Sequence, residues 1–381
     1  MLDVDEEWAN FISSNQNDTD DEDEVDQLSE YLKEHEPEYA SSTDVLPEIP
    51  TASNIYISTK TKIAYLNTPI PLADLFWKVP VINYYIPTKG VIKKQMKFNS
   101  TLPSEVEDIQ EKLKGIDYFE EHVITHIDNP SGRIKFKDIR KISIGISKKD
   151  IMSYRCKKRS AFYNCFVIML RLNIENQFKE FHVKVFNTGK LEIPGVQNEA
   201  TFQLILNEVV QLLQPYIDIP LYYKPDTEIT VLINSNFNCG FYINRESLYE
   251  ILKYKYNIQA IYDPCSYPGI QCKFYYNPDV EVQTGSQIAE DKKHLYKQVK
   301  EVSFMIFRTG SVLIVGKCDE SVLMVIYEYL KNVLVEEFKH IYQKGASGDV
   351  GMKEKQKKTR RKTLMIEFDS TPENEYMLSN E

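Results

Sequence analysis

Apolar and polar residues alternate along 181–195, FHVKVFNTGKLEIPG, on both sides of a short Asn-Thr-Gly segment. A period of two predicts strands and the interruption predicts a tight turn, so we expect an antiparallel hairpin here. The stretch 303–317, SFMIFRTGSVLIVGK, has the same alternation, with a Phe directly before its turn and Thr-Gly inside it. The chain therefore contains two copies of one hairpin.

Each hairpin is followed by a segment in which apolar residues recur at helical spacing. The two segments, 198–213 and 319–334, open on Asn198 and Asp319, which are suited to N-capping, and each has a glutamate in its first turn. The repeated unit is thus strand, turn, strand and helix. Duplication of such a unit sets the organisation of the chain before any single motif is interpreted.

A strand and a short helix are also predicted near the start of each half. Their ranges are 54–67 and 69–76 in the first half, and 229–244 and 245–252 in the second. We align Tyr65-Leu66-Asn67 with Tyr242-Ile243-Asn244 at the ends of the two strands. Each half is then expected to begin strand, helix, strand and to end strand, strand, helix.

The middle of the two halves differs in length. In the second half it is compact, with strands predicted at 258–264 and 269–277. In the first half an insertion of about 100–160 interrupts the unit before a strand at 162–173. Within the insertion the pattern predicts a helix over 103–114, strands over 132–136 and 141–146, and a basic cluster of Arg155, Lys157, Lys158 and Arg159.

Charge is distributed unevenly along the 381 residues, whose formal net charge is -10. Residues 1–50 hold 17 acidic residues and one lysine, so the remainder of the chain is net positive. Such a charged leader is expected to be disordered, either as a solubilising tail or as an occupant of a basic, nucleic-acid-binding surface. We expect an acidic tail at 1–50, a first repeat at 51–224, a second repeat at 225–343, and a tail at 344–381 that contains the basic segment 353–362.

Composition excludes several classes of protein. No run of about 18 apolar residues and no leader of the secretory type is present, so we expect neither a membrane span nor secretion. The six cysteines form no C-x-x-C pair, which favours reduced thiols in an intracellular protein. There is no Walker loop, no G-x-S-x-G and no zinc quartet, and His122 and His126 lack a third ligand in register. We therefore expect no enzyme activity, no cofactor, no bound metal and no small-molecule substrate.

Four short segments carry a resemblance to a known family. The run 262–270, YDPCSYPGI, resembles the Y-E-P-E-x-F-P-G-L segment of TATA-box-binding proteins. Phe304 to Gly310 is similar to the family's L-I-F-x-S-G, and in the first half Val167-Ile-Met and 185–190, VFNTGK, match V-I-M-R-I and L-I-F-S-S-G-K. The resemblance covers about 54–340 apart from the insertion. With its acidic leader, the chain looks most like the divergent TBP-like proteins of nucleocytoplasmic large DNA viruses.

The resemblance implies an α+β saddle of two pseudo-symmetric repeats. In that fold a curved antiparallel sheet binds the minor groove of DNA and helices cover the convex back. Proteins of this kind insert apolar wedges between base steps and kink the duplex. By the family's motif the wedge aromatics correspond to Phe186 and Phe307, each directly before its turn, to Tyr267 in the second repeat, and to Phe162 or Tyr163 in the first.

Strand alternation indicates which neighbours share the concave face. If Phe304 and Ile306 face the helices, Met305 and Phe307 face the DNA, and Lys184 and Phe186 do so in the first repeat. The candidate DNA contacts on this face are Asn54, Lys184, Lys190, Met305, Leu313 and Val315, and the candidate phosphate contacts are Lys93, Lys94 and Lys97. The alternatives are ordinary sheet packing for the aromatic residues and a solvated surface for the lysines.

Some positions depart from the family's pattern. Pro194 and Val315 stand where the family has threonines that touch base edges, and Glu192 falls on the face that would meet the negative potential of the minor groove. Asn54 alone represents the family's asparagine pair, because Asn234 lies out of register in our alignment. These departures predict an altered sequence preference, or loss of DNA binding.

The resemblance implies a transcription initiation factor. Such a protein would bind and bend A·T-rich promoter DNA and recruit RNA polymerase or general transcription factors, in the nucleus or in a viral factory or virion. The alternative is a protein-interaction scaffold that kept the fold but lost specific DNA readout. A gel mobility-shift assay with duplex DNA distinguishes the two.

Overall fold

A computed structural model describes residues 47–152, 162–289, 296 and 298–344. Most of the acidic leader, the cluster of Arg155, Lys157, Lys158 and Arg159, and the basic segment 353–362 lie outside these residues. The described part divides into two compact units. Unit 1 comprises 47–79, 164–167 and 181–344, and unit 2 comprises 80–152, 162–163 and 168–180.

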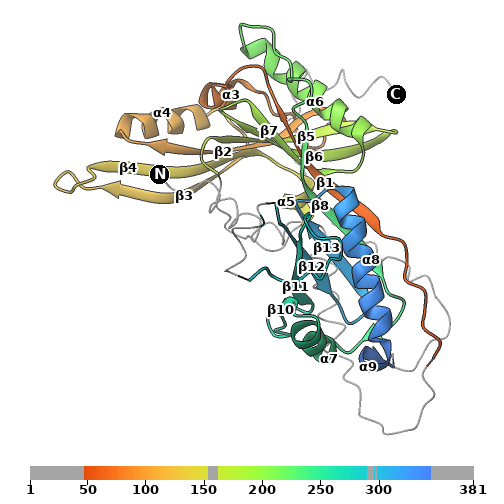
Figure 1. The fold of residues 1–381 in the computed structure, drawn as a ribbon. Coiled ribbons are helices and arrows are strands. Elements are labelled where there is room, and N and C mark those ends of the chain that lie inside the picture. The colour runs from red at the N-terminus through yellow and green to blue at the C-terminus, as the bar shows by residue number, and fades with distance from the viewer. Residues whose placement is uncertain (1–46, 153–161, 290–295, 297, 345–381) are drawn as a thin grey trace. The chain divides into compact units, whose positions relative to one another are not determined.

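Unit 1 is built on a large antiparallel sheet with helices (Figure 1). Its strands follow the order β10-β11-β12-β13-β8-β1-β7-β6, of which β6 belongs to unit 1 from Phe181 onward. The strands are β1 (Tyr56–Tyr65), β6 (Gln177–Phe186), β7 (Lys190–Val196), β8 (Ile229–Asn238), β10 (Gln259–Ile261), β11 (Ile270–Tyr276), β12 (Lys300–Ile306) and β13 (Ser311–Gly316). A separate two-stranded ladder joins β9 (Tyr242–Ile243) to β14 (Tyr342–Gln343). The α+β class with a large antiparallel sheet agrees with the sequence-based expectation.

Helices of unit 1 pack on one face of the sheet. They are α3 (Leu72–Lys78), α6 (Glu199–Leu213), α7 (Arg245–Glu250), α8 (Glu320–Glu336) and α9 (Phe338–Ile341), with a short 3₁₀ turn η1 (Gln214–Tyr216) and a π-helical turn η2 (Ile251–Lys255). Helix α8 lies along β11, β12 and β13 (Figure 1). Its apolar side, including Leu323, Ile326 and Leu330, joins Phe304 and Ile314 of the sheet in one buried core.

The two long helices begin where the sequence predicts, but their starts differ. The Asn198 side chain accepts a hydrogen bond from the Thr201 N–H at 2.8 Å, as an N-cap should. Asp319 occupies the N-cap position of α8 but makes no such bond, because its carboxylate pairs with Lys300 Nζ at 2.5 Å. The expectation of capping is therefore confirmed for Asn198 and wrong for Asp319.

Matching hydrogen bonds relate the two hairpins to the strands beside them. Leu66 N–H donates to Gly189 O at 2.8 Å, and Cys239 N–H donates to Gly310 O at 2.9 Å. Four residues after each of these donors, Ile70 N–H donates to Asn187 O and Ile243 N–H donates to Arg308 O. These bonds make Cys239 the equivalent of Leu66. Our alignment matches Leu66 with Ile243, which lies four residues later.

The cause of that alignment error is a turn. The predicted strand 229–244 ends at Asn238, because the Asn238 side chain accepts from the Gly240 N–H at 2.7 Å and Gly240 has a left-handed φ of 89°. Tyr242–Ile243 then forms the separate strand β9. The match of Tyr65-Leu66-Asn67 with Tyr242-Ile243-Asn244 rested on similar letters and is wrong.

Unit 2 contains β5 (Cys165–Ile174) in part, with β2 (Gly90–Ser100), β4 (Phe136–Gly145) and β3 (Phe119–Asp128) in the order β5-β2-β4-β3. Helix α4 (Pro103–Leu113) lies beside β2, and a five-residue helix α5 (Lys148–Met152) follows β4. The helix predicted at 103–114 is confirmed. The strand predicted at 132–136 is wrong, since the chain makes a turn there before β4 begins.

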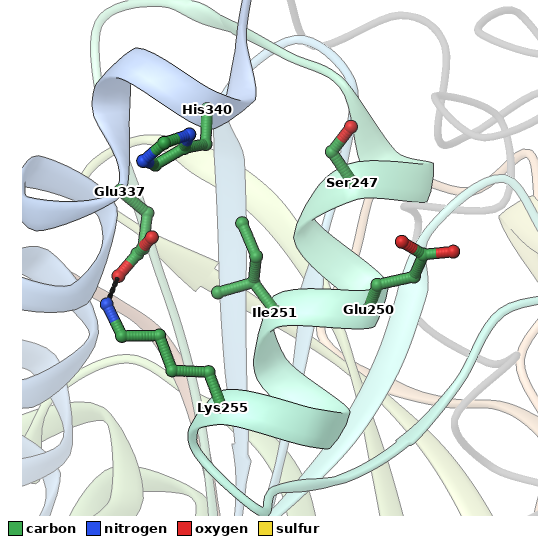
Figure 2. Close-up of a pocket in the computed structure, with 6 residues that line it drawn as sticks. All are labelled: Ser247, Glu250, Ile251, Lys255, Glu337 and His340. Carbon is green, nitrogen blue, oxygen red and sulfur yellow. Dashed lines mark hydrogen bonds and ion pairs between the residues drawn. The ribbon is translucent and has the colours of Figure 1, made fainter.

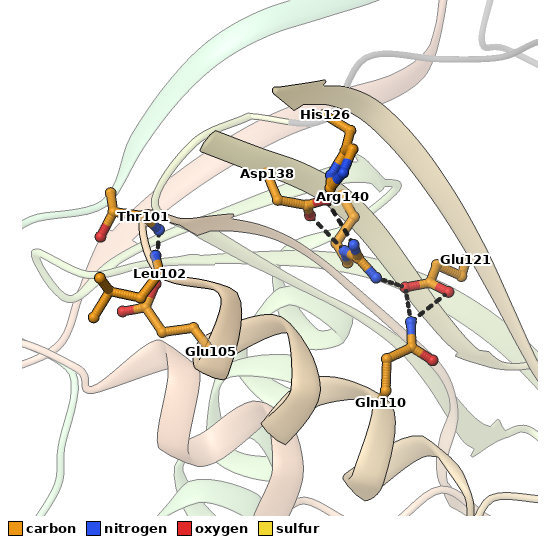
Figure 3. A network of polar contacts seen from close by, with 8 residues as sticks. All are labelled: Thr101, Leu102, Glu105, Gln110, Glu121, His126, Asp138 and Arg140. Atoms are coloured by element: carbon orange, nitrogen blue, oxygen red, sulfur yellow. Dashed lines mark hydrogen bonds and ion pairs between the residues drawn. The ribbon is translucent and has the colours of Figure 1, made fainter. Parts of the chain in front are cut away.

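A polar network holds α4, β3 and β4 together in unit 2 (Figure 3). The Asp138 carboxylate is fully buried and accepts two hydrogen bonds from Arg140, at 2.5 and 2.6 Å, while His126 Nδ1 lies 2.8 Å from it. Arg140 also reaches Glu121, which accepts from Gln110 of α4. The bonds from Arg140 hold the pKa of Asp138 below its usual value, although burial acts in the opposite direction.

No described helix is long and apolar enough to cross a membrane.

Candidate nucleic-acid interface

Unit 1 has a sheet face that points away from α6 and α8, which we call the opposite face. On β12, Phe304 and Ile306 are fully buried in the core with α8, whereas Met305 and Phe307 are not part of that core. On β1, Lys62 points toward α6, with its Nζ 4.1 Å from the Phe202 ring centroid. The alternation expected from the sequence is therefore observed for these strands.

The second-half face is the part of the opposite face formed by Asn236, Met305, Phe307, Leu313 and Val315. Its central row runs straight across three strands, since Met305 pairs with Leu313 and Leu313 with Asn236. In the next row Val315 pairs with Asn234 of β8. The face is thus apolar on β12 and β13 and carries amide side chains on β8.

An aromatic pair closes the end of this face. The Tyr267 and Phe307 rings lie 5.9 Å apart and are tilted by 58°. Both rings pass over Gly269, where an added Cβ would come within 3.1 Å of each. Tyr267 O–H also lies 3.6 Å from Met305 Sδ. The two predicted wedge aromatics of the second repeat are therefore neighbours; Phe307 is 5% exposed.

The first-half face comprises Ile63, Lys184, Phe186, Lys190 and Glu192. Its central row is Lys184, Glu192 and Ile63, which pair across β6, β7 and β1. Lys184 Nζ lies 2.8 Å from Glu192 Oε1, and both side chains are almost completely buried. Counting from the equivalent turn glycines, Lys184 and Glu192 occupy the positions of Met305 and Leu313. An ion pair replaces an apolar pair.

Electrostatics of this pair follow from its burial. Burial lowers the pKa of Lys184, and the neighbouring Glu192 carboxylate opposes that shift. Among the described residues, no hydrogen-bond partner reaches the second carboxylate oxygen, Glu192 Oε2. Burial raises the pKa of the nearby Cys165 thiol to about 12, so this cysteine is a neutral, unreactive side chain at neutral pH.

The hairpin end of the first-half face differs from that of the second. Lys190 Nζ lies 5.0 Å from the centroid of the Phe186 ring, a cation–π arrangement. The second half has Ser311 at the position of Lys190. Phe186 is half-buried, and the structure places Pro194 further along β7, near its end.

The remaining sequence candidates are Phe162, Tyr163, Lys93, Lys94, Lys97 and Asn54. Phe162 and Tyr163 belong to unit 2, where Lys97 Nζ lies 3.6 Å from the Tyr163 ring centroid. Lys93 pairs with Asp150 Oδ1 at 2.7 Å. Lys93, Lys94 and Lys97 are all less than one tenth exposed, and burial lowers the pKa of Lys94 to about 8. Asn54 is exposed and precedes β1.

Sequence reasoning missed the row of asparagines on β8. In our alignment Asn234 lies out of register, but its cross-strand partners are Val315 and Thr59, so it lies on the opposite face. The signal was present as the alternation Ile-Asn-Ser-Asn-Phe-Asn at 233–238. The pairing of Lys184 with Glu192 was also missed, because cross-strand register is set by the whole sheet.

A cavity lies away from the opposite face, at the ends of α7, η2 and α9 (Figure 2). It is lined by Ser247, Glu250, Ile251, Lys255, Glu337 and His340. Lys255 and the Tyr256 hydroxyl bind the buried Glu337 carboxylate. Although burial opposes the change, these bonds hold the pKa of Glu337 below its usual value. Because the Glu337 carboxylate already has hydrogen-bond partners within the protein, we interpret the cavity as a contact between helices that serves the fold. The described residues contain no group of three or more side chains suited to a metal ion.

Comparison with known proteins supports the motif-based resemblance. No protein-family model matches the chain. Over 214 residues the chain is 24% identical to a protein of Acanthamoeba polyphaga mimivirus named TATA-box-binding protein-like, and the match covers 51% of this chain and 54% of that protein. The chain thus spans about half the length of this relative. Among solved structures it is similar to Methanococcus jannaschii TBP, with a TM-score of 0.37 and 12% identity over 75% of this chain and 99% of that chain. The resemblance to TATA-box-binding proteins is confirmed by the mimivirus protein.

Proposed function

We propose that this chain is a TATA-binding-protein-like transcription factor that binds duplex DNA with the opposite face of unit 1. One observation carries the proposal: two hairpins with equivalent hydrogen bonds each place a phenylalanine, Phe186 or Phe307, directly before the turn that joins two strands of one antiparallel sheet. A strand-built face with aromatic residues at its ends suits a minor groove that is kinked by inserted rings. The similarity to a protein named TATA-box-binding protein-like is consistent with this function.

The finer features of the proposal follow from the same frame. The halves 51–224 and 225–343 would be pseudo-symmetric repeats of a saddle, with β1 and β8 side by side at its centre. The segment 100–160 would be an insertion in the first repeat. The helices on the other side of the sheet, and the insertion, would recruit RNA polymerase or general transcription factors in a nucleus or viral factory.

The neighbours of each lysine determine which DNA contact it could make. Lys190 lies on the opposite face beside Phe186, which suits a contact to a phosphate next to an inserted ring. Lys184 is already paired with Glu192, so it would influence DNA binding through its effect on that ion pair. A phosphate contact by Lys93 requires that its bond to Asp150 be exchanged for one to the DNA.

A gel mobility-shift titration of the full chain against A·T-rich and G·C-rich duplexes tests the proposal. We expect binding at low salt that weakens steeply as salt rises, because phosphate contacts release counterions. Joint replacement of Phe186→Ala and Phe307→Ala is expected to abolish the shifted band. A folded wild-type chain that shifts no duplex at low salt contradicts the proposal and favours a protein-interaction scaffold.

The same assay tests the acidic leader. If residues 1–50 occupy the DNA-binding surface, their removal tightens binding. Unchanged affinity identifies them as a tail without that role.

A further inference from the structure

The two halves of the opposite face share a backbone frame but present different chemistry at their centres. At one position the second-half face has Leu313 and the first-half face has Glu192, and their cross-strand partners are Met305 and Lys184. Met305 is 7% exposed and Lys184 is 4% exposed, so both centres are largely buried in the free protein. The difference between the halves is therefore one of chemistry and not of exposure.

The edges of base pairs in the minor groove discriminate between these two centres. An A·T pair presents only acceptors there, the adenine N3 and the thymine O2, whereas a G·C pair adds one donor, the guanine 2-amino group. A carboxylate such as that of Glu192 presents acceptor oxygens to a ligand. It therefore opposes an A·T edge, acceptor against acceptor, and matches the guanine amino group.

One oxygen of Glu192 lacks a hydrogen-bond donor within the described part of the chain but is buried, so a base edge reaches it only if the residues around it move. Oε1 is bound by Lys184 at 2.8 Å, while Oε2 has no hydrogen-bond partner among the described residues and the side chain is 1% exposed. Leaving a buried acceptor without a donor is costly, so a donor supplied by a ligand is strongly favoured at this atom. Lys184 also neutralises the carboxylate, which reduces its repulsion by DNA phosphates.

The second-half face has the opposite preference. Met305, Leu313 and Val315 carry no oxygen acceptor that could receive a 2-amino group, and the apolar row fits the smooth floor of an A·T minor groove. Asn234 and Asn236, in the same rows, carry amide N–H groups that can donate to adenine N3 or thymine O2, while their amide oxygens can accept from a guanine amino group. An amino group projecting into this apolar centre would lose hydrogen bonds to water without replacement.

We propose that the two halves select different base pairs: the second-half face accepts A·T pairs, and Glu192 on the first-half face selects a G·C pair through the guanine 2-amino group. This inference rests on the proposed function. It makes the recognised site asymmetric and gives the bound protein a fixed direction on the DNA. It also replaces the expectation of uniformly A·T-rich DNA with an A·T tract that is interrupted on one side.

The test uses fluorescence anisotropy with the full chain and a set of duplexes. Each duplex has an A·T tract with one G·C pair, moved one position at a time, and each has a partner in which inosine replaces that guanine. Inosine removes only the 2-amino group from the minor groove. We expect one side of the site where guanine binds at least about tenfold more tightly than inosine, as for a hydrogen bond to a charged group. On the other side guanine should bind more weakly than inosine.

Three variants make the assignment specific. Lys184→Met with Glu192→Leu copies the second-half pair into the first half and should abolish the preference for guanine. Met305→Lys with Leu313→Glu copies the ion pair into the second half and should create a second position that prefers guanine. Lys62→Met with Glu199→Gln removes a more exposed ion pair from the α6 side of the sheet and should leave base selection unchanged. Circular dichroism confirms that each variant is folded.

The outcomes separate the inference from the proposed function. A wild-type chain that binds no duplex overturns both. A wild-type chain that binds, but shows no difference between guanine and inosine at any position, overturns the inference alone. A guanine preference that survives in the Lys184→Met, Glu192→Leu variant overturns the role of Glu192.

Discussion

The two halves of unit 1 keep the same turn and the same backbone hydrogen bonds, yet they differ at the centre of the face they share. Gly189 accepts a bond from the residue directly after β1 and Gly310 from the residue directly after β8, and both glycines have φ close to 80°. On the two strands of the hairpin, the first half has Lys184 and Glu192 at the positions where the second half has Met305 and Leu313. The frame is conserved within the chain while the face is not.

This contrast separates the residues that make the fold from those that make the site. Backbone bonds and turn glycines are dictated by sterics, so both copies need them. Side chains on a face that does not pack against helices are under no such constraint. A duplicated fold can therefore present two different surfaces on the same backbone frame.

The first predicted effect on stability concerns the frame. At Gly189 an added Cβ would lie 2.5 Å from the Thr68 carbonyl oxygen, and at Gly310 it would clash with the Phe241 carbonyl oxygen. Gly189→Ala and Gly310→Ala should each lower the free energy of unfolding by more than the ~1–2 kcal/mol that a left-handed residue alone costs. Urea denaturation measures this. Gly195→Ala is the matched control, since its φ is 78° and nothing lies within 4 Å of the added Cβ. Equal losses at all three glycines would contradict the steric argument.

The next effect concerns the buried ion pair. Lys184→Met alone leaves the Glu192 carboxylate buried and uncompensated, which should lower the free energy of unfolding by about 3–5 kcal/mol. The double variant Lys184→Met, Glu192→Leu should recover most of that loss, because an apolar pair fits this position in the second half. A double-mutant cycle in urea measures the coupling. A single variant as stable as the wild type would mean that the two charges are solvated and unpaired.

A smaller effect distinguishes the two kinds of DNA contact. Phe186→Ala and Phe307→Ala should each weaken duplex binding about tenfold or more without changing its salt dependence, since stacking on a base is worth about 1–3 kcal/mol. Lys190→Gln should instead reduce the slope of log affinity against log salt by about one. Anisotropy titrations at several salt concentrations measure both. A changed salt slope in the phenylalanine variants would argue against insertion of these rings.

The smallest effect lies in unit 2, whose strands β3 and β4 have no equivalent between β10 and β11 of the second half. Because the folded-state pKa of Asp138 is depressed, chiefly by its bonds to Arg140, its stabilising contribution is present above the unfolded pKa and is lost as pH falls through the folded one. Amide hydrogen exchange in β3 and β4 of the full chain should therefore accelerate in acid relative to the intrinsic rate of an unprotected amide at the same pH. Asp138→Asn should remove that pH dependence while β12 and β13 are unaffected. Equal acceleration in both units would show global unfolding instead.

Local patterns predicted most of the fold. The alternation at 181–195 and 303–317 gave both hairpins, and the helical spacing after them gave α6 and α8 to within two residues at each end. These elements were predictable because neighbouring residues alone determine their period. The strand β3 was missed: its Glu-Glu-His-Val-Ile-Thr-His run has no clean alternation, and a bulge between Val123 and Thr125 breaks its register.

The candidate site was less predictable than the fold. Parity placed Met305 and Phe307, and Lys184 and Phe186, on one face, as the structure has them. Which residues meet across strands depends on register, so the contact of Lys184 with Glu192 and the position of Asn234 opposite Val315 could not be read from the chain. Burial of Lys93, Lys94 and Lys97 likewise depends on tertiary packing that no local pattern encodes.

The central claim is that the opposite face of unit 1 binds and bends duplex DNA. Energy transfer between dyes at the two ends of a short duplex tests it most directly, because a kinked duplex brings its ends together. We predict that the full chain raises the transfer efficiency on binding, and that the variant with both Phe186→Ala and Phe307→Ala does not. Binding of the wild-type chain with no change in transfer efficiency would contradict the account.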